Sequence, residues 1–137
     1  MVPPIFENPE SLPSPLGYSQ LVELDAGRLV LIAGQVALDA SGNLVGCGDI
    51  RAQAHQVFLN LSAALKARDG TFADLVKLNI FVTDIADLPV LREVRDEHFA
   101  GLTRSPVSTL VQVQALFRPE FLIEIEAMSW LAPQQRN

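Results

Sequence analysis

The sequence has little cysteine, no long apolar run and no segment with the pattern of a signal peptide at residues 1–16, and each absence argues against a class of protein. Cys47 is the only cysteine among the 137 residues, which rules out an internal disulfide and a metal site built from clustered thiolates. No segment reaches the ~18 consecutive apolar residues of a membrane span, and residues 1–16 lack the basic start and apolar stretch of a signal peptide. We therefore expect a cytoplasmic protein with no membrane partner.

Basic residues are also scarce, and they do not cluster. Ten Lys and Arg against 16 Asp and Glu give a formal net charge of −6, so the chain lacks the basic surface that binds a phosphate backbone. His55 and His98 are far apart in sequence, in two separate predicted helices, without the spacing of metal ligands. We therefore predict no nucleic-acid partner, no metal site and no histidine pair suited to RNA cleavage.

Proline is concentrated at one end of the chain. Residues 1–16 hold five of the nine prolines, and because proline has no backbone N–H, we expect an extended arm without regular structure over its length. Residues 17–132 are predicted to form one domain, followed by a tail at 133–137. The composition, 49% hydrophobic and 19% charged, is typical of a globular protein with some surface hidden between subunits.

Turn residues and apolar periodicity predict two strands and a helix in the first half of the domain. Residues 19–24 and 28–35 are rich in Leu, Val and Ile, and residues 25–27 between them are typical of a hairpin turn. Asp49 is a candidate N-cap for a helix that Gly70 ends. The apolar residues of this helix follow the i, i+4, i+7, i+11, i+15 spacing of one face: Ile50, Ala54, Val57, Leu61 and Leu65.

The second half of the domain is predicted to contain three strands and a helix. A strand is expected at residues 75–83, where Leu78, Ile80 and Val82 alternate with the residues between them. Two more strands are expected near residues 108–114 and 122–130. The helix begins at Asp84 or Asp87 and runs to about residue 100. Its inner residues are expected to be Leu88, Leu91, Val94 and His98. The order of five strands and two helices predicts an α/β (α+β) domain in which a sheet packs against the two helices.

A sheet with both helices on one side has an uncovered face. Phe81, Val111 and Val113 are apolar residues that we expect on this face. Because a large exposed apolar surface is unusual on a soluble monomer, the simplest cover is another copy of the chain. The sequence therefore predicts self-association.

The last strand carries two acidic residues that share one face. Glu124 and Glu126 are two positions apart, so their side chains point the same way while those of Ile123 and Ile125 point to the other face. Two solvated carboxylates on a surface strand would give the same pattern. The alternative is a carboxylate that orients or deprotonates a water molecule, which requires a pKa nearer neutrality than that of a free glutamate.

Several separated motifs, in the same order, resemble those of the RidA-like (YjgF) family of reactive-intermediate deaminases, over about residues 17–131. The motifs are Gly17-Tyr18-Ser19-Gln20, Ala33-Gly34-Gln35, Asp49-Ile50-Arg51-Ala52-Gln53-Ala54 with Asn60, the strand at 76–84, and Glu124-Ile125-Glu126-Ala127. The resemblance implies a chorismate-mutase-like fold with a mixed sheet of about six strands packed against two helices. It also implies assembly as a barrel-like homotrimer with a small-molecule pocket at each subunit interface and no cofactor. It also implies an activity, because active members hydrolyse enamines and imines to 2-keto acids and ammonia.

The resemblance also assigns roles to individual residues. Glu124 matches the glutamate that assists water and is the expected catalytic residue. The expected ligand-binding residues are Tyr18, Ala33, Gly34, Ser108 and Leu110. Ser108 stands where active members have the arginine that holds the substrate carboxylate, Leu110 where a pocket cysteine is found, and Ala33 where a serine is found. A serine hydroxyl offers one donor and no charge, whereas arginine offers a bidentate fork.

The missing arginine leaves alternatives open. Arg92, Arg104 or Arg118 could supply the cation, although each is also typical of a surface charge. Without a cation, the pocket would suit a neutral imine, enamine, carbamate or amide-like molecule better than a 2-imino acid. A trimer that binds and senses a metabolite without catalysis is the main alternative to an enzyme. An endoribonuclease, an activity attributed to some relatives, is disfavoured by the acidic charge.

Overall fold

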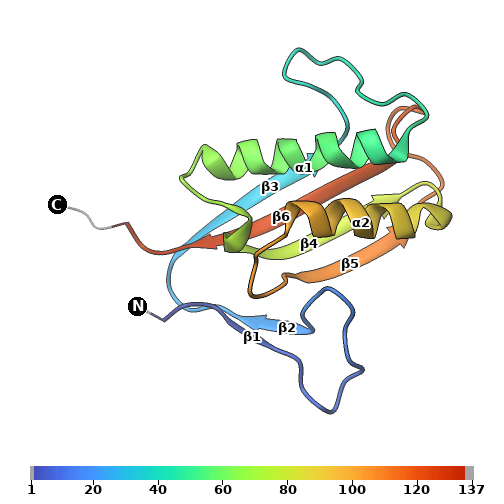
Figure 1. Ribbon diagram of the computed structural model, residues 1–137. Coiled ribbons are helices and arrows are strands. Elements are labelled where there is room, and N and C mark those ends of the chain that lie inside the picture. Colours follow the sequence, from blue (N-terminus) through green and yellow to red (C-terminus); the bar gives the residue numbers. More distant parts are fainter. Residues whose placement is uncertain (1, 135–137) are drawn as a thin grey trace.

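The computed structural model describes residues 2–134 and contains two sheets and two α-helices (Figure 1). A four-stranded sheet has the strand order β3-β6-β4-β5, and a separate two-stranded sheet pairs β1 with β2. The predicted α/β class, with a mixed sheet on two helices, is confirmed, but the six strands are divided between two sheets. The elements are β1 (Ile5–Glu7), β2 (Leu21–Glu23), β3 (Arg28–Gln35), α1 (Ile50–Lys66), β4 (Leu75–Val82), α2 (Leu88–His98), β5 (Val107–Gln112) and β6 (Ile123–Leu131), with 3-10 turns at Phe72–Asp74 and Ile85–Asp87.

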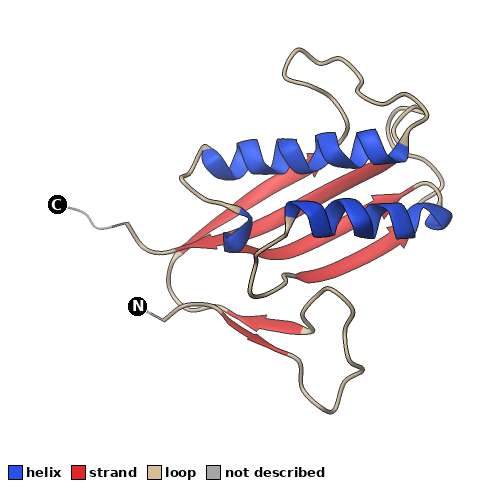
Figure 2. Cartoon of the chain, in the orientation of Figure 1, coloured by secondary structure: helices blue, strands red, loops and turns tan. Residues whose placement is uncertain are grey.

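Both α-helices lie on the same face of the four-stranded sheet, and the other face carries no helix (Figure 2). Strands β3 and β4 each pair with β6 in the antiparallel sense, whereas β4 and β5 are parallel. Helix α2 makes the crossover between these two parallel strands, as parallel pairing requires. The arrangement positions the edge strand β5 beside α2.

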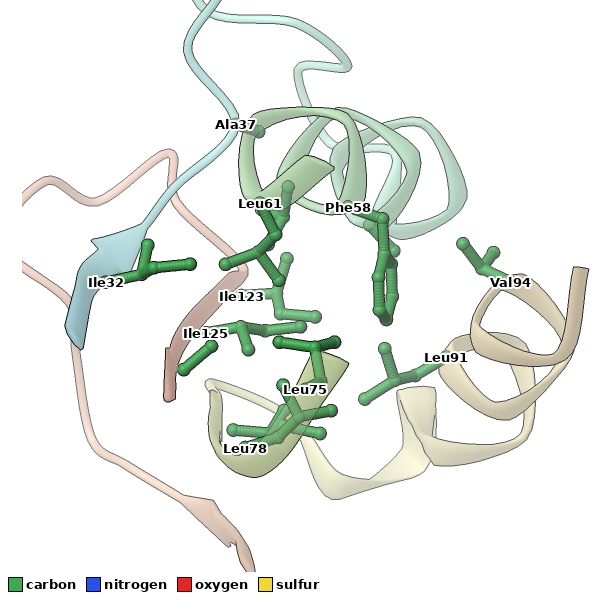
Figure 3. Close-up of a cluster of buried hydrophobic side chains, with 14 of the residues drawn as sticks. Ile32, Ala37, Phe58, Leu61, Leu75, Leu78, Leu91, Val94, Ile123 and Ile125 are labelled. Atoms are coloured by element: carbon green, nitrogen blue, oxygen red, sulfur yellow. The ribbon is translucent and has the colours of Figure 1, made fainter. Parts of the chain in front are cut away.

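Helix α1 forms as predicted, from a side-chain cap and one apolar face. The Asp49 carboxylate accepts a hydrogen bond from the backbone N–H of Ala52, which satisfies one of the unpaired donors of the first turn. The helix ends at Lys66, four residues before Gly70, because Asp69 adopts a left-handed φ of 60°. The buried face contains Phe58, Leu61 and further apolar residues, which pack on Leu78, Ile123 and Ile125 of the sheet (Figure 3).

The predicted hairpin between residues 19–24 and 28–35 is wrong. Strand β2 pairs with β1, and β3 pairs with the C-terminal strand β6. Residues 25–27 instead link the two sheets, and the indole of Trp130 holds them by donating to the carbonyl of Asp25 at 3.0 Å. A Cβ at Gly27 would lie 2.3 Å from the Trp130 ring, so only glycine leaves room for this contact.

The N-terminal arm is extended but not free of regular structure. Residues 5–7 pair with β2, so hydrogen bonding reaches into the proline-rich segment between its prolines. The guanidinium of Arg104 lies 4.6 Å from the centre of the Phe6 ring and donates to the carbonyl of Pro4 at 3.3 Å.

The predicted tail at 133–137 lies largely outside the described residues. Within residues 2–134, neither helix has the length and apolar character needed to cross a bilayer.

The two histidines form a pair, which contradicts the expectation of none. His55 on α1 and His98 at the end of α2 are 2.9 Å apart between ring nitrogens, and the His98 ring stacks on Phe58. Burial, and then the neighbouring His55, lower the pKa of His98, so this ring favours the neutral form. Glu97 lies 3.4 Å from His55, but no group of three metal-ligating side chains exists among the described residues. The pair therefore fastens α1 to α2.

Candidate functional site

A groove of about 350 Å³ between α2 and the edge strand β5 brings together three of the predicted site residues. Ser108 and Leu110 come from β5, and Tyr18 comes from the segment that leads to β2. The backbone N–H of Ser19 donates to the carbonyl of Pro106 at 3.0 Å, which holds the residue after Tyr18 against the start of β5. The groove is thus built from segments about 90 residues apart in the chain.

The groove also contains two arginines of α2. Arg92, one of the three predicted replacement cations, lines it, and so does Arg95, which the sequence did not suggest. The other two candidates are engaged elsewhere. Arg104 holds the N-terminal arm, and Arg118 forms an ion pair with Glu120 while lying 4.8 Å from the Phe121 ring.

Glu124 lies on the uncovered face of the sheet, not in the groove. It is opposite Phe81 of β4 in the strand register, and its side chain is half-buried. Burial raises the pKa of Glu124 above its ordinary value, and the negative charge of Glu126 raises it further. Within residues 2–134 no hydrogen-bond donor or cation pairs with the Glu124 carboxylate, so its oxygens are free to take a proton from a bound molecule.

Gly34 makes room for this carboxylate. The pairing of β3 with β6 shifts between Ile32 and Gln35, so that Ala33 and Gly34 form a bulge on β3. A Cβ placed on Gly34 would lie 2.7 Å from Oε2 of Glu124, closer than such atoms can approach. Gly34 therefore leaves the space that the Glu124 carboxylate occupies.

Ala33 lines a hollow on the uncovered face next to Glu126. This hollow has a volume of about 250 Å³, and the polar residues that line it include Asn79 and Lys77. The amide of Asn79 donates to the Glu126 carboxylate at 2.7 Å, which distinguishes this glutamate from Glu124. Of the two acidic residues on β6, Glu124 is the one whose carboxylate has no partner in the described chain, and burial raises its pKa.

The six predicted site residues thus fall into two sets on opposite faces of the sheet. Ser108 pairs in register with Leu78, which is buried under the helices, whereas Glu124 pairs with Phe81 on the uncovered face. Side chains alternate along a strand, so these two positions of β4 point in opposite directions. One copy of the chain cannot bring Ser108 and Glu124 to the same small molecule.

Comparison with known proteins identifies the family. A sequence model described as Endoribonuclease L-PSP, which includes the RidA-like proteins, matches residues 10–130. The chain belongs to this family. Protein DfrA of Myxococcus xanthus is 37% identical over 121 residues, covering 88% of the chain and 90% of DfrA. A mouse relative, named 2-iminobutanoate/2-iminopropanoate deaminase, is 34% identical over 122 residues, covering 88% of the chain and 87% of that protein.

Solved structures of RidA-family proteins confirm the fold. The crystal structure of YyfB, a Rid-family protein of unknown function from Yersinia pestis, superimposes with a TM-score of 0.85. It is 38% identical and covers 93% of this chain and 98% of its own. RidA from an Antarctic Psychrobacter species superimposes with a TM-score of 0.70 at 33% identity, over 90% of this chain and 97% of its own. The resemblance inferred from separated sequence motifs is therefore confirmed.

Proposed function

We propose that the protein is a homotrimer that hydrolyses the C–N bond of a small imine or enamine in clefts between its subunits. The observation that carries this proposal is the separation of the Ser108 groove from Glu124 on opposite faces of one sheet. A second copy, docked by its edge, would bring its own Glu124 to the groove of the first. Exposed apolar residues support docking on the uncovered face, since Leu29, Leu31 and Val111 are 53%, 66% and 41% exposed in the single chain.

The chemistry needs a base and a polarised C=N bond, and no cofactor. Glu124 removes a proton from water as the water oxygen bonds to the imine carbon, and it returns this proton to the nitrogen, which gives a neutral tetrahedral amino-alcohol. Glu124 then takes the proton of the new hydroxyl group and passes it to the nitrogen as the C–N bond breaks, so that ammonia leaves as the carbonyl forms. An elevated pKa suits Glu124 to both steps, because the same carboxyl group accepts and returns the proton.

Ser108 separates this protein from a typical 2-iminobutanoate deaminase. The named deaminases among its relatives point to imine chemistry, yet a serine cannot form the bidentate charged contact that an arginine makes with a carboxylate. We infer that the substrate differs from the typical 2-imino acids. Either its negative charge lies elsewhere in the molecule, or it has no negative charge at the end that contacts Ser108.

Ammonia release tests the proposal directly. A series of imines and enamines is generated in the assay, from 2-imino acids to neutral imines, and ammonia is measured with and without the protein. We expect acceleration for at least one imine outside the 2-imino acids, and a particle of three times the 14.9 kDa chain mass by light scattering. A monomer would contradict the shared cleft. A trimer that binds such molecules without releasing ammonia would establish the non-catalytic alternative instead.

Replacing Gly34 by alanine tests whether the space beside Glu124 matters. The added methyl group would overlap the carboxylate, so the carboxylate must move while the backbone stays. Misplacing a reacting group by about 1 Å costs on the order of 10- to 100-fold in rate, and we expect a fall of that size in ammonia release. The free energy of unfolding should change by less than about 1 kcal/mol, because a flexible carboxylate yields easily. An unchanged rate would show that the position of the carboxylate does not limit turnover.

A further inference from the structure

The groove between α2 and β5 has the opposite charge to the rest of the protein. The chain carries a formal net charge of −6, but the residues that line the groove include two arginines and no aspartate or glutamate. Its apolar lining comes from α2, β4, β5 and nearby loops: Leu16, Ile80, Ile85, Leu88, Leu91 and Leu110. Tyr18 and Ser108 add hydroxyl groups. Such a lining suits a small molecule with an apolar body and one negative charge.

The two arginines are not equivalent. Nε and Nη2 of Arg95 both donate to the carboxylate of Asp96, at 3.0 and 2.9 Å, so its charge is offset within the helix. The guanidinium of Arg95 also packs against the backbone of Gly17, where a Cβ would lie 2.4 Å away. Arg95 therefore supports the turn that carries Tyr18.

Arg92 is available to a ligand. Within residues 2–134 its guanidinium makes no ion pair with a carboxylate and no hydrogen bond, whereas the neighbouring helix acid Glu93 pairs with Arg51 of α1. Arg92 is exposed at the wall of the groove that faces Ser108 on β5. A free guanidinium presents a fixed fork of donors, the geometry that a planar carboxylate accepts.

We propose that Arg92 holds the ligand of this groove, and that the ligand is a small monocarboxylate with an apolar chain. The positive anchor has moved from the strand position occupied by Ser108 to helix α2 across the groove. The carboxylate is therefore held at the α2 wall, and the apolar chain lies over Leu91 and Leu110. This inference rests on the proposed function, because the groove is taken to be part of the intersubunit cleft. Binding of the ligand can nevertheless be measured without any catalytic turnover.

A pair of matched probes tests the assignment, namely 4-methylpentanoate and its neutral amide. Their affinities for the intact protein are measured by calorimetry at low salt. We expect the carboxylate to bind about tenfold or more tightly than the amide, a preference that weakens as salt is added. In Arg92→Gln the preference should disappear, and in Arg92→Lys it should be partly kept because the charge remains without the fork.

Two control variants make the outcome specific. Arg68→Gln removes the same charge from an exposed residue that does not line the groove, and it should keep the full preference. Equal binding of both probes to the unaltered protein, or binding of neither, would overturn the proposal. So would a preference that survives in Arg92→Gln and is lost in Arg95→Gln. The calorimetric assay measures binding and not ammonia. It therefore tests the role of Arg92 separately from the proposed deamination.

Discussion

Ammonia release is expected to fall about 100-fold or more when Glu124 is replaced by glutamine, because general base catalysis typically contributes that much or more. The substitution keeps the size of the side chain but removes the group that takes the proton from water. The carboxylate has no hydrogen-bond partner within residues 2–134, so the fold loses no observed contact. We expect the trimer mass and the free energy of unfolding to remain close to those of the unaltered protein. The measurement is the steady-state rate on whichever imine the protein accepts.

Glu126→Gln is the matched control for this substitution. Glu126 is on the same face of β6 and carries the same charge, but its carboxylate accepts a hydrogen bond from Asn79 at 2.7 Å. The rate should change little at neutral pH. The pH dependence should change, because Glu126 is one of the two causes that raise the pKa of Glu124.

The direction of that pH shift follows from the role of the base. Glu124 must be ionised to accept a proton, so the rate rises as the pH rises through its pKa. Removing the negative charge of Glu126 lowers the pKa of Glu124, and the acid limb of the profile should move to lower pH. A Glu124→Gln variant that keeps its rate would exclude Glu124 as the base, and a full loss of activity in Glu126→Gln would show that Glu126 is more than a neighbouring charge.

The sequence predicted helix α1 and strand β4 well, because each depends on interactions between residues close together in the chain or on a regular spacing of apolar residues. Asp49 caps α1 within its own first turn. Leu78, Ile80 and Val82 alternate with less buried residues, as the sequence indicates. The bounds of both elements agree with the predictions to within a few residues.

Strand pairing could not be predicted in the same way. Residues 25–27 look like a hairpin turn, but the partner of β3 is β6, about 100 residues later. A turn motif shows only that the local backbone can turn. It does not show which strands pair with each other. The burial of Ile32 beside Ala127, and the contact of Trp130 with Gly27, depend on a segment that the turn does not contain. Long-range packing therefore overrides the local signal.

The sequence predicted which residues contribute to the candidate site, but not how these residues are arranged in space. Tyr18, Ser108 and Leu110 do meet in one groove, whereas Glu124 lies on the other face of the sheet. Alternation along β6 shows only that Glu124 and Glu126 share a face, not which one. Arg95 gave no sequence signal because an arginine beside an aspartate is typical of a solvated helix surface. Its place in the groove follows from the packing of α2 on β5.

Gln53 is a second residue whose importance the sequence did not reveal. It is a polar side chain on the inner face of α1, with no exposed surface. Its amide nitrogen donates to the carbonyls of Gly46 and Glu120 at 3.0 and 2.8 Å, and its oxygen accepts from the backbone N–H of Leu122 at 2.9 Å. One buried amide therefore joins the loop before α1 to the start of β6, two residues before Glu124.

Replacing Gln53 by methionine should lower the free energy of unfolding by about 3 kcal/mol or more, since each partner left unsatisfied in a buried site costs roughly 1–3 kcal/mol. Methionine has a similar length, so a cavity cannot explain the loss. Denaturant unfolding of the intact protein measures the change. Gln56→Met is the control on the same helix. Gln56 is half-buried, and among the described residues its side chain bonds only Asn60, at 2.9 Å, a partner that water can replace.

The same substitution should also reduce ammonia release under conditions where the variant remains folded. Leu122 would lose its bond to α1, so the first residues of β6 would no longer be fixed relative to the helix layer. Glu124 would then vary in position beside Gly34, and the rate should fall while the affinity for a groove ligand, bound on the other face of the sheet, stays nearly constant. Equal losses of rate and of groove affinity would show that Gln53 supports the whole domain rather than the position of Glu124.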